Sequence, residues 1–408
     1  MISVEDHLAR CVRAVQPLDP IELGLLEAQD CVLAEDVVSP LDLPGFANSA
    51  MDGYAVVAAD VAAASEDAPV RLPVVADVPA GSTERLRLSP GQAARIMTGA
   101  PLPDGAEAVV PVEVTDGGVD QVELRAPAEE GQHVRRAGAD VRRGDTVLSA
   151  GTLLGPAQLA LLAAVGRDRV VVQAPPRVVI LSTGSELVEP GTVPGFGQVV
   201  DSNGVMLAAA AVDAGARPRL VGVVRDEAQA FLEALESELA DADLVVTSGG
   251  VSAGAYDTVK EVLSKLGTVW FGKVAMQPGM PQGFGTVGPD ATPIFTLPGN
   301  PVSAFVSFEM FVRPVIRKLA GHQGLFRRSE MAVALDSWTA PAGKLQLARG
   351  ELGRTKDGRR VVRLTGQQSS HVLGGLARAG ALVVVPEQVT RVEAGDEVRC
   401  LVLDRRRR

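Results

Sequence analysis

The sequence predicts an α/β plus β fold class with several domains: a doubly wound α/β domain, a mainly β insertion domain before it and a small β-barrel at the carboxyl terminus. From residue 177 to about 320, apolar strand-like runs such as RVVILS and DLVVTS alternate with helical stretches. Continuous apolar strands between helices are typical of a parallel sheet covered on both faces. Before and after this region, short apolar runs bounded by Gly, Pro and Asp indicate β-rich domains.

The domain order follows from these changes in pattern. Ser3 and Asp6 have the spacing of a capping box, so a helix is expected to begin there, and a proline-rich linker follows it. A second helix is expected to begin near Pro156 and to pack back on the first segment. The predicted domains are 1–45 together with 146–175 (linker and helices), 46–145 (mainly β), 176–325 (α/β) and 326–408 (β-barrel).

Composition excludes several classes of partner. The 408-residue chain has a formal net charge of -11 and only 3% aromatic residues, so neither phosphate-backbone binding nor base stacking is favoured. No apolar run reaches the roughly 18 residues of a membrane span. Cys11, Cys31 and Cys400 are odd in number and widely spaced, which indicates neither a disulfide framework nor a zinc site. We therefore expect a cytoplasmic protein without a nucleic-acid or membrane partner.

Small polar residues and glycines follow the expected strands of the α/β domain. In an open parallel sheet, ligands bind beyond the carboxyl ends of the strands, where the loops converge. Ser182, Thr183 and Gly184 end the first strand. The segment after the fourth strand contains Pro298, Gly299, Asn300, Pro301 and Ser303.

The loop after the third strand, TSGGVSAGAYD, is the most polar of these segments. Gly249 and Gly250 let backbone N–H groups approach an anion closely, and Ser248 and Ser252 can donate hydroxyl groups. Asp257 stands where the next helix should begin. The loop is therefore a candidate phosphate-binding segment.

Three carboxylates could place a metal ion beside that anion. Glu186, Asp226 and Asp257 all follow strands at the same edge of the expected sheet, and oxygen ligands suit Mg²⁺. From the residues alone an alternative stays open, in which the glycines form turns and Asp257 caps a helix.

Other motifs do not favour a different chemistry. GFGTVG at 283–288 matches a dinucleotide-binding pattern, but no helix follows it, so glycine-rich strands are expected there. The sequence has neither a Walker A nor an HExxH motif. FANSAMDGYAV has two open interpretations, a functional segment or a structural turn closed by the side chain of Asp52.

Five motifs together identify a family. The segments are, in order, NSAMDGYAV, IMTGAPLPDGAEAVV, STGSEL, TSGGVSAGAYD and LPGNPVSA. In this order and spacing they resemble the MoeA type of molybdopterin molybdenumtransferase, which is shared with the E domain of gephyrin. The resemblance covers essentially the whole chain. It implies an elongated, four-domain subunit with a molybdopterin-binding-like α/β domain, and a homodimer.

The resemblance also implies an activity: insertion of molybdate into adenylylated molybdopterin, with Mg²⁺-dependent hydrolysis of the adenylate and release of AMP. An adenylyltransferase would be a further partner. The cleft would lie between the α/β domain of one subunit and the SAMDGYA segment of the other. The implied catalytic residues are Asp52 and Thr98 from the second subunit, with Asp257 and Lys273, and the implied metal ligands are Glu186, Asp226 and Asp257.

Further residues are implied to bind the substrates. Arg349 and Ser370 match positions that reach toward the oxyanion from the last domain. The other implied binding residues are Ser182, Thr183, Gly184, Ser248, Gly249, Gly250, Ser252, Pro298, Gly299, Asn300, Pro301 and Ser303.

The sequence departs from the family pattern at QPGMP. Many relatives carry lysines where this chain has Gln277 and Met280, and charge-assisted hydrogen bonds are roughly twice as strong as neutral ones. The affinity for molybdate, and the choice between molybdate and tungstate, are therefore open. Two alternative functions also stay open: an enzyme like the molybdopterin adenylyltransferase, and a non-catalytic molybdopterin-binding or scaffold protein.

Overall fold

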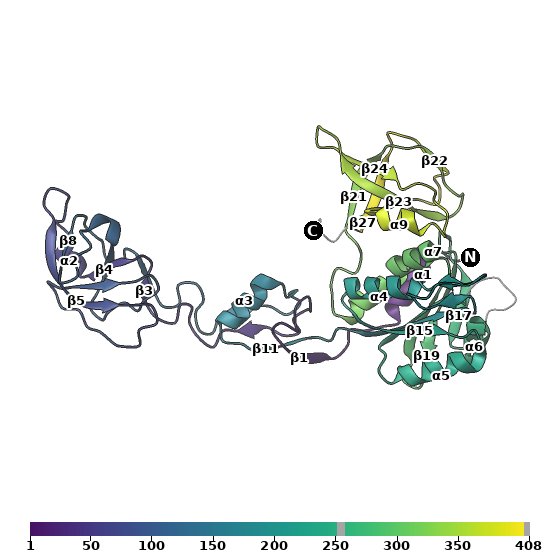
Figure 1. Cartoon of the computed structure of the whole chain (residues 1–408), viewed down its shortest axis with the longest axis horizontal. Coiled ribbons are helices and arrows are strands. Elements are labelled where there is room, and N and C mark those ends of the chain that lie inside the picture. Colours follow the sequence, from purple (N-terminus) through teal and green to yellow (C-terminus); the bar gives the residue numbers. More distant parts are fainter. Residues whose placement is uncertain (251–257, 404–408) are drawn as a thin grey trace. The chain divides into compact units, whose positions relative to one another are not determined.

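The computed structural model describes residues 1–250 and 258–403, and the chain folds into two compact units (Figure 1). The first unit comprises Met1–Ile21, Asp30–Ala34 and Val171–Arg408, and the second comprises Glu22–Gln29 and Glu35–Val170. An α/β sheet, a half-barrel and a closed barrel confirm the predicted fold class. The division into four domains stays a prediction. Within the described ranges, no helix is long and apolar enough to cross a bilayer.

A six-stranded sheet with the order β15-β12-β16-β20-β19-β17 forms the centre of the first unit. The four predicted strands are its four neighbouring parallel strands, and β19 runs antiparallel to both of its neighbours. A Cβ atom on Gly283 of β19 would lie 1.8 Å from Thr296 Oγ1, so close packing explains a glycine of the GFGTVG segment. The strands are β12 (Arg177–Thr183), β15 (Arg217–Val224), β16 (Leu244–Ser248), β17 (Val269–Lys273), β19 (Pro281–Val287) and β20 (Thr292–Leu297).

Helices cover both faces of this sheet, as Figure 1 shows. Alternate residues of β12 point to opposite cores: Val178 and Ile180 to one, Val179 and Leu181 to the other. The first core is packed by α1 (Val4–Arg13), α4 (Asn203–Ala214), α7 (Pro301–Ser307) and α8 (Arg313–Leu319), and the second by α5 (Ala228–Leu239) and α6 (Thr258–Leu266). Because both faces are buried, the sheet can bind a ligand only where its strands end.

The carboxyl-terminal part of the first unit is a barrel that closes through pairing of β23 with β25. Leu347, Leu382 and Val384 of the barrel belong to the same apolar core as α4 and α7, so the barrel is packed against the α/β part. Its elements are β18 (Met276–Gln277), β21 (Ser329–Ala334), β22 (Trp338–Thr339), β23 (Leu345–Arg354), β24 (Arg360–Leu364), α9 (Leu373–Arg378), β25 (Ala381–Val385), β26 (Arg391–Val392) and β27 (Glu397–Val402).

A largely buried ionic network reinforces this junction. Arg313 donates from Nη1 to Asp213 Oδ2 at 2.8 Å, and Arg327 donates from Nε to Glu309 Oε2 at 2.8 Å. Arg327 also bonds to Asp213. Asp213 lies on α4, Glu309 on the π-helical turn η2 (Phe308–Val312), and Arg327 just before the barrel. The four charges therefore compensate one another between the helix layer and the chain that enters the barrel.

The second unit contains a five-stranded half-barrel with the order β7-β4-β6-β5-β8. Tyr54 and Val110 are buried in its core. The elements wholly in this unit are β2 (Val37–Val38), β3 (Asn48–Ser49), β4 (Gly53–Val56), α2 (Ala58–Val61), β5 (Val70–Val78), β6 (Ala93–Ile96), β7 (Ala108–Pro111), η1 (Val112–Val114), β8 (Gln121–Leu124), β9 (Val134–Arg135), β10 (Thr146–Leu148) and α3 (Pro156–Ala164). The ranges of β1 (Pro20–Gly24) and β11 (Arg169–Gln173) cross the boundary between the units.

Helix α1 begins as predicted, with Ser3 Oγ accepting a hydrogen bond from the Asp6 backbone N–H at 2.9 Å. The sequence did not indicate that His7 would be fully buried on the same face as Cys11. Its ring lies 5.2 Å from that of Trp270 and 4.6 Å from that of Phe311, measured between centroids. Burial, followed by the nearby charge of Arg10, lowers the pKa of His7 to about 4.

This burial predicts a pH-dependent stability. Between pH 6.5 and about 4 the unfolded chain binds a proton at His7 that the folded chain does not, so stability falls as the pH decreases through this window. The contribution should be about 2 kcal/mol between pH 7.5 and pH 5. Urea unfolding followed by tryptophan fluorescence at both pH values should show a smaller loss in His7→Gln than in the wild type. An equal loss in both proteins would contradict the assignment.

Candidate functional site at the carboxyl edge of the sheet

Two adjoining hollows open at the carboxyl edge of the central sheet. The smaller one, of about 310 Å³, collects most of the residues that the sequence predicted for phosphate and metal binding. It lies where β12, β15, β16 and β20 end, as expected for an open parallel sheet. Its lining comprises Thr183, Gly184, Glu186, Leu187, Asn203, Asp226, Ser248, Gly249, Gly250 and Gly299.

The glycines of this hollow are required by backbone geometry. Gly249 has φ +95° and Gly250 has φ +77°, values that side chains rarely tolerate. A Cβ atom on Gly249 would also lie 2.5 Å from the carbonyl oxygen of Thr183. The loop after β16 can therefore lie against the end of β12 only with glycine there. The Gly249 N–H, which the sequence predicted to approach an anion, instead donates to the carbonyl oxygen of Leu297 at 3.0 Å.

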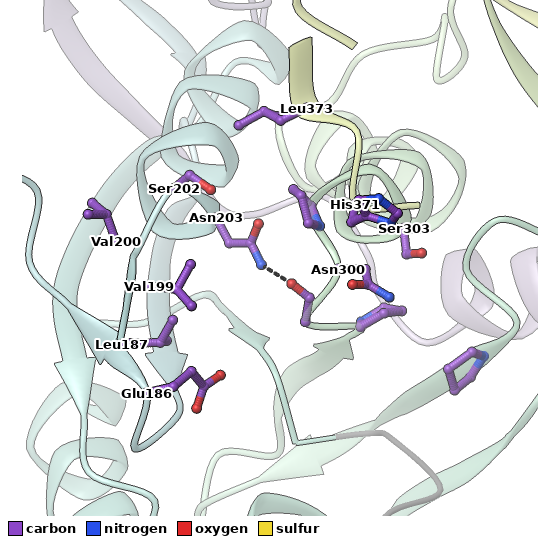
Figure 2. A pocket seen from close by; sticks show the side chains of 14 residues that line it. Glu186, Leu187, Val199, Val200, Ser202, Asn203, Asn300, Ser303, His371 and Leu373 are labelled. Carbon is purple, nitrogen blue, oxygen red and sulfur yellow. Dashed lines mark hydrogen bonds between the residues drawn. The ribbon is translucent and has the colours of Figure 1, made fainter. Parts of the chain in front are cut away.

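Asn203, at the start of α4, holds the two glycine-rich loops together. Its Nδ2 atom donates to Ser248 Oγ at 2.7 Å. The same atom donates to the carbonyl oxygen of Gly299 at 2.7 Å, the bond that is dashed in Figure 2. Asn203 is 9% exposed and lines both hollows. The role of Asn203 was not apparent from the sequence, because DSNG is typical of an ordinary helix start. Asp201 Oδ1 indeed accepts a hydrogen bond from the Gly204 N–H at 3.0 Å.

The larger hollow has a volume of about 670 Å³ and is bounded by both parts of the first unit. Figure 2 shows Glu186 and Leu187 on one side, and Asn300, Ser303 and His371 on the other. Its remaining lining residues are Val199, Val200, Ser202, Asn203, Pro281, Pro298, Gly299, Pro301 and Leu373. The hollow thus combines an apolar wall with a few polar groups, which is typical of a small-molecule site.

Arg349 does not line either hollow. It is 1% exposed, and its guanidinium donates to the carbonyl oxygens of Val372 at 2.6 Å, Gln367 at 2.6 Å and Ser369 at 3.2 Å. In this structure it therefore holds the loop 366–372 rather than reaching toward a ligand. Ser370 belongs to that loop and its carbonyl oxygen accepts from the Val302 N–H at 3.0 Å.

The other predicted residues of the first unit lie beside the hollows. Ser182 is fully buried at the end of β12. Lys273 is exposed and pairs with Pro281 of the larger hollow in the β17–β19 ladder. Gln277 is exposed at the end of β18, and Met280 is half-buried. Ser252 and Asp257 lie outside the described residues.

Asp52 and Thr98, predicted together, contact each other in the second unit. The Asp52 Oδ1 atom accepts from the Thr98 backbone N–H at 2.6 Å and from Thr98 Oγ1 at 2.8 Å. The backbone hydrogen bond first, and then the hydroxyl, lower the pKa of this exposed carboxyl. Asp52 therefore stays ionised at neutral pH, and Thr98 fixes its orientation. The Asp52 side chain thus links two segments of the second unit, as the structural interpretation predicted. Its carboxylate is also exposed, so a ligand can reach it.

Among the described residues that line the smaller hollow, Glu186 and Asp226 carry carboxylates. Within the described ranges, no cluster of three or more acidic, histidine or cysteine side chains is arranged as a metal site. Mg²⁺ often takes only one or two carboxylates and completes its shell with phosphate oxygens and water. The two carboxylates of this hollow fit such an ion when the ligand supplies further oxygens.

Comparison with known proteins agrees with these features. Three family models match the chain: the MoeA N-terminal region (domain I and II) over residues 2–166, a probable molybdopterin binding domain over 179–318, and the MoeA C-terminal region (domain IV) over 331–403. Together they span both units.

Whole-length relatives were also found. Molybdopterin molybdenumtransferase 2 of Mycobacterium tuberculosis is 48% identical over 98% of this chain and 99% of its own. The molybdopterin molybdenumtransferase of Nostoc is 40% identical over 99% of this chain and 94% of its own. Among solved structures, a molybdopterin biosynthesis MoeA protein from Pyrococcus horikoshii superposes with a TM-score of 0.80 at 32% identity, covering 99% of each chain. The chain therefore belongs to the MoeA family of molybdopterin molybdenumtransferases.

Proposed function

We propose that this protein inserts molybdate into adenylylated molybdopterin and releases AMP as part of molybdenum cofactor biosynthesis. The observation that carries the proposal is the pair of adjoining hollows, one lined by glycines and two carboxylates and the other by an apolar wall with amide, hydroxyl and imidazole groups. A substrate with a phosphate-bearing end and a flat heterocyclic end requires both kinds of surface. Relatives named for this activity match over the full length, so the adenylyltransferase-like and scaffold alternatives are not favoured.

Each group of residues has a distinct part in this proposal. Glu186 and Asp226, with Asp257, would hold Mg²⁺. When bound, that ion polarises the phosphoanhydride and stabilises the departing phosphate. Gly250, which has a left-handed backbone, would offer its N–H group to the phosphates.

The other residues of the site would position the substrates and would form no covalent bond with them. Hydrolysis consumes one water molecule, breaks the P–O–P bond and leaves the pterin with its own phosphate. Asn203 keeps the glycine-rich loops at a fixed separation, and Lys273 contributes positive charge beside Pro281. Tight positioning of the reacting groups is worth several powers of ten in rate.

We propose a homodimer in which Asp52 and Thr98 serve the site of the other subunit, and an adenylyltransferase that delivers the substrate. A cytoplasmic location is proposed on the residues themselves, since Cys11, Cys31 and Cys400 are odd in number and widely spaced, which argues against a disulfide framework.

The first experiment measures AMP release and reconstitution of a molybdenum-free apoenzyme by the purified protein with adenylylated molybdopterin, Mg²⁺ and molybdate. Glu186→Gln and Asp226→Asn keep size but remove charge, so each should lower the rate by about 100-fold and raise the Mg²⁺ concentration needed for half-maximal rate. Val193→Ala, a change on the exposed loop after β13 (Leu187–Val188), is the matched control. Absence of molybdate-dependent AMP release by the wild type would refute the proposed function.

Sharing of the site between subunits can be tested by complementation. Asp52→Ala and Glu186→Gln should each be nearly inactive alone. After exchange in a 1:1 mixture, about a quarter of the wild-type rate should return, because half of the dimers are mixed and each mixed dimer has one intact site. If Asp52 served its own subunit, or if the chain were a monomer, the mixture would stay as inactive as its components.

A further inference from the structure

The loop 366–372 of the barrel is held in place by a buried arginine. Three of its carbonyl oxygens, those of Gln367, Ser369 and Val372, accept hydrogen bonds from the guanidinium of Arg349. The side chain of Gln368 also bonds to Arg349, accepting from its backbone N–H at 2.8 Å and donating to its carbonyl oxygen at 3.2 Å. Burial lowers the pKa of Arg349, but a guanidinium stays charged in proteins.

The same loop is attached to the α/β part of the unit. The carbonyl oxygen of Ser370 accepts from the Val302 N–H at 3.0 Å, in the first turn of α7. Hydrogen bonds on both sides of residue 371 thus determine the path of the backbone there. A residue fixed in this way has little conformational entropy left to lose on binding a ligand.

His371 is the side chain that this arrangement presents. It is exposed and lines the larger hollow, beside Asn300 and Ser303 (Figure 2). Of the described residues that line this hollow, His371 alone has a basic side chain. Glu186 lies on the opposite side. The hollow is therefore polarised, with a carboxylate at one side and an imidazole at the other.

We infer that His371 is a substrate-binding residue that donates a hydrogen bond to an anionic oxygen of the bound substrates, and that Arg349 is its positioning residue. The inference rests on the proposed function, which supplies two sources of such an oxygen, molybdate and the phosphate of the nucleotide. The hydroxyl of Ser303 and the amide of Asn300 can complete the same oxygen-binding corner. Arg349 acts through the loop, because its donors are engaged by carbonyl oxygens.

Two substitutions separate hydrogen bonding from shape. His371→Phe keeps a flat ring but has no donor, whereas His371→Gln keeps an N–H donor. Calorimetric titration with sodium molybdate and, separately, with AMP and Mg²⁺ should show weaker binding of at least one probe to His371→Phe, by roughly 10-fold or more, and near-wild-type binding to His371→Gln. The probe that weakens identifies the source of the oxygen. With adenylylated molybdopterin, KM should rise more than kcat falls.

Arg349→Lys tests the positioning role. Lysine keeps the charge but cannot bond to three carbonyl oxygens at once. If Arg349 acts through His371, Arg349→Lys should weaken the same probe, and the double variant with His371→Phe should bind no more weakly than the weaker single variant. Multiplicative losses would show that Arg349 contacts the substrate independently and would overturn its positioning role. If Arg349→Lys does not fold, the His371 pair alone decides the inference.

Unchanged affinity of His371→Phe for both probes would overturn the inference. Equal weakening in His371→Phe and His371→Gln would do so as well, because the donor would then not matter. A wild type that binds the probes but releases no AMP would instead refute the proposed function. The titrations with molybdate and with AMP would still decide the role of His371.

Discussion

Burial of the central sheet on both faces is the constraint on which the site depends. Successive residues of β12 enter two separate apolar cores, so the body of the strand has no surface to offer a ligand. Polar side chains can accumulate only where the strands end, as Ser182, Thr183 and Ser248 do. The α/β architecture thus gathers residues that lie far apart in sequence at one edge, where both hollows open.

That edge is not optimised for stability. Ser182 Oγ, Thr247 Oγ1 and Thr296 Oγ1 are buried without a hydrogen-bond partner among the described residues. Each such group costs about 1–3 kcal/mol relative to a satisfied one. Unsatisfied groups and left-handed glycines thus lie together at this edge, and such features are typical of functional sites.

Sequence patterns predicted the features that depend on neighbouring residues in the chain. Continuous apolar runs identified the four parallel strands, and the glycines and hydroxyls that follow them identified the edge where ligands should bind. The roles of Asn203, His371 and Arg349 depend on contacts across distant segments. The Arg349 guanidinium bonds to carbonyl oxygens 18 to 23 residues away, and Asn203 bonds to residues 45 and 96 positions away. No periodicity or motif encodes such partners, so only the fold could reveal them.

Gln277 and Met280 carry no charge, so positive charge for an anionic substrate must come from elsewhere at this site. The chain carries a net charge of -11, the larger hollow has one basic side chain among its described lining residues, and the smaller one has two carboxylates. A substrate with several phosphate charges would be repelled by Glu186 and Asp226 if it arrived alone. Under the proposed function, a divalent cation must therefore enter with the phosphates. This makes the metal, rather than protein cations, the main source of attraction, and a neutral donor such as Gln277 can then suffice beside the oxyanion.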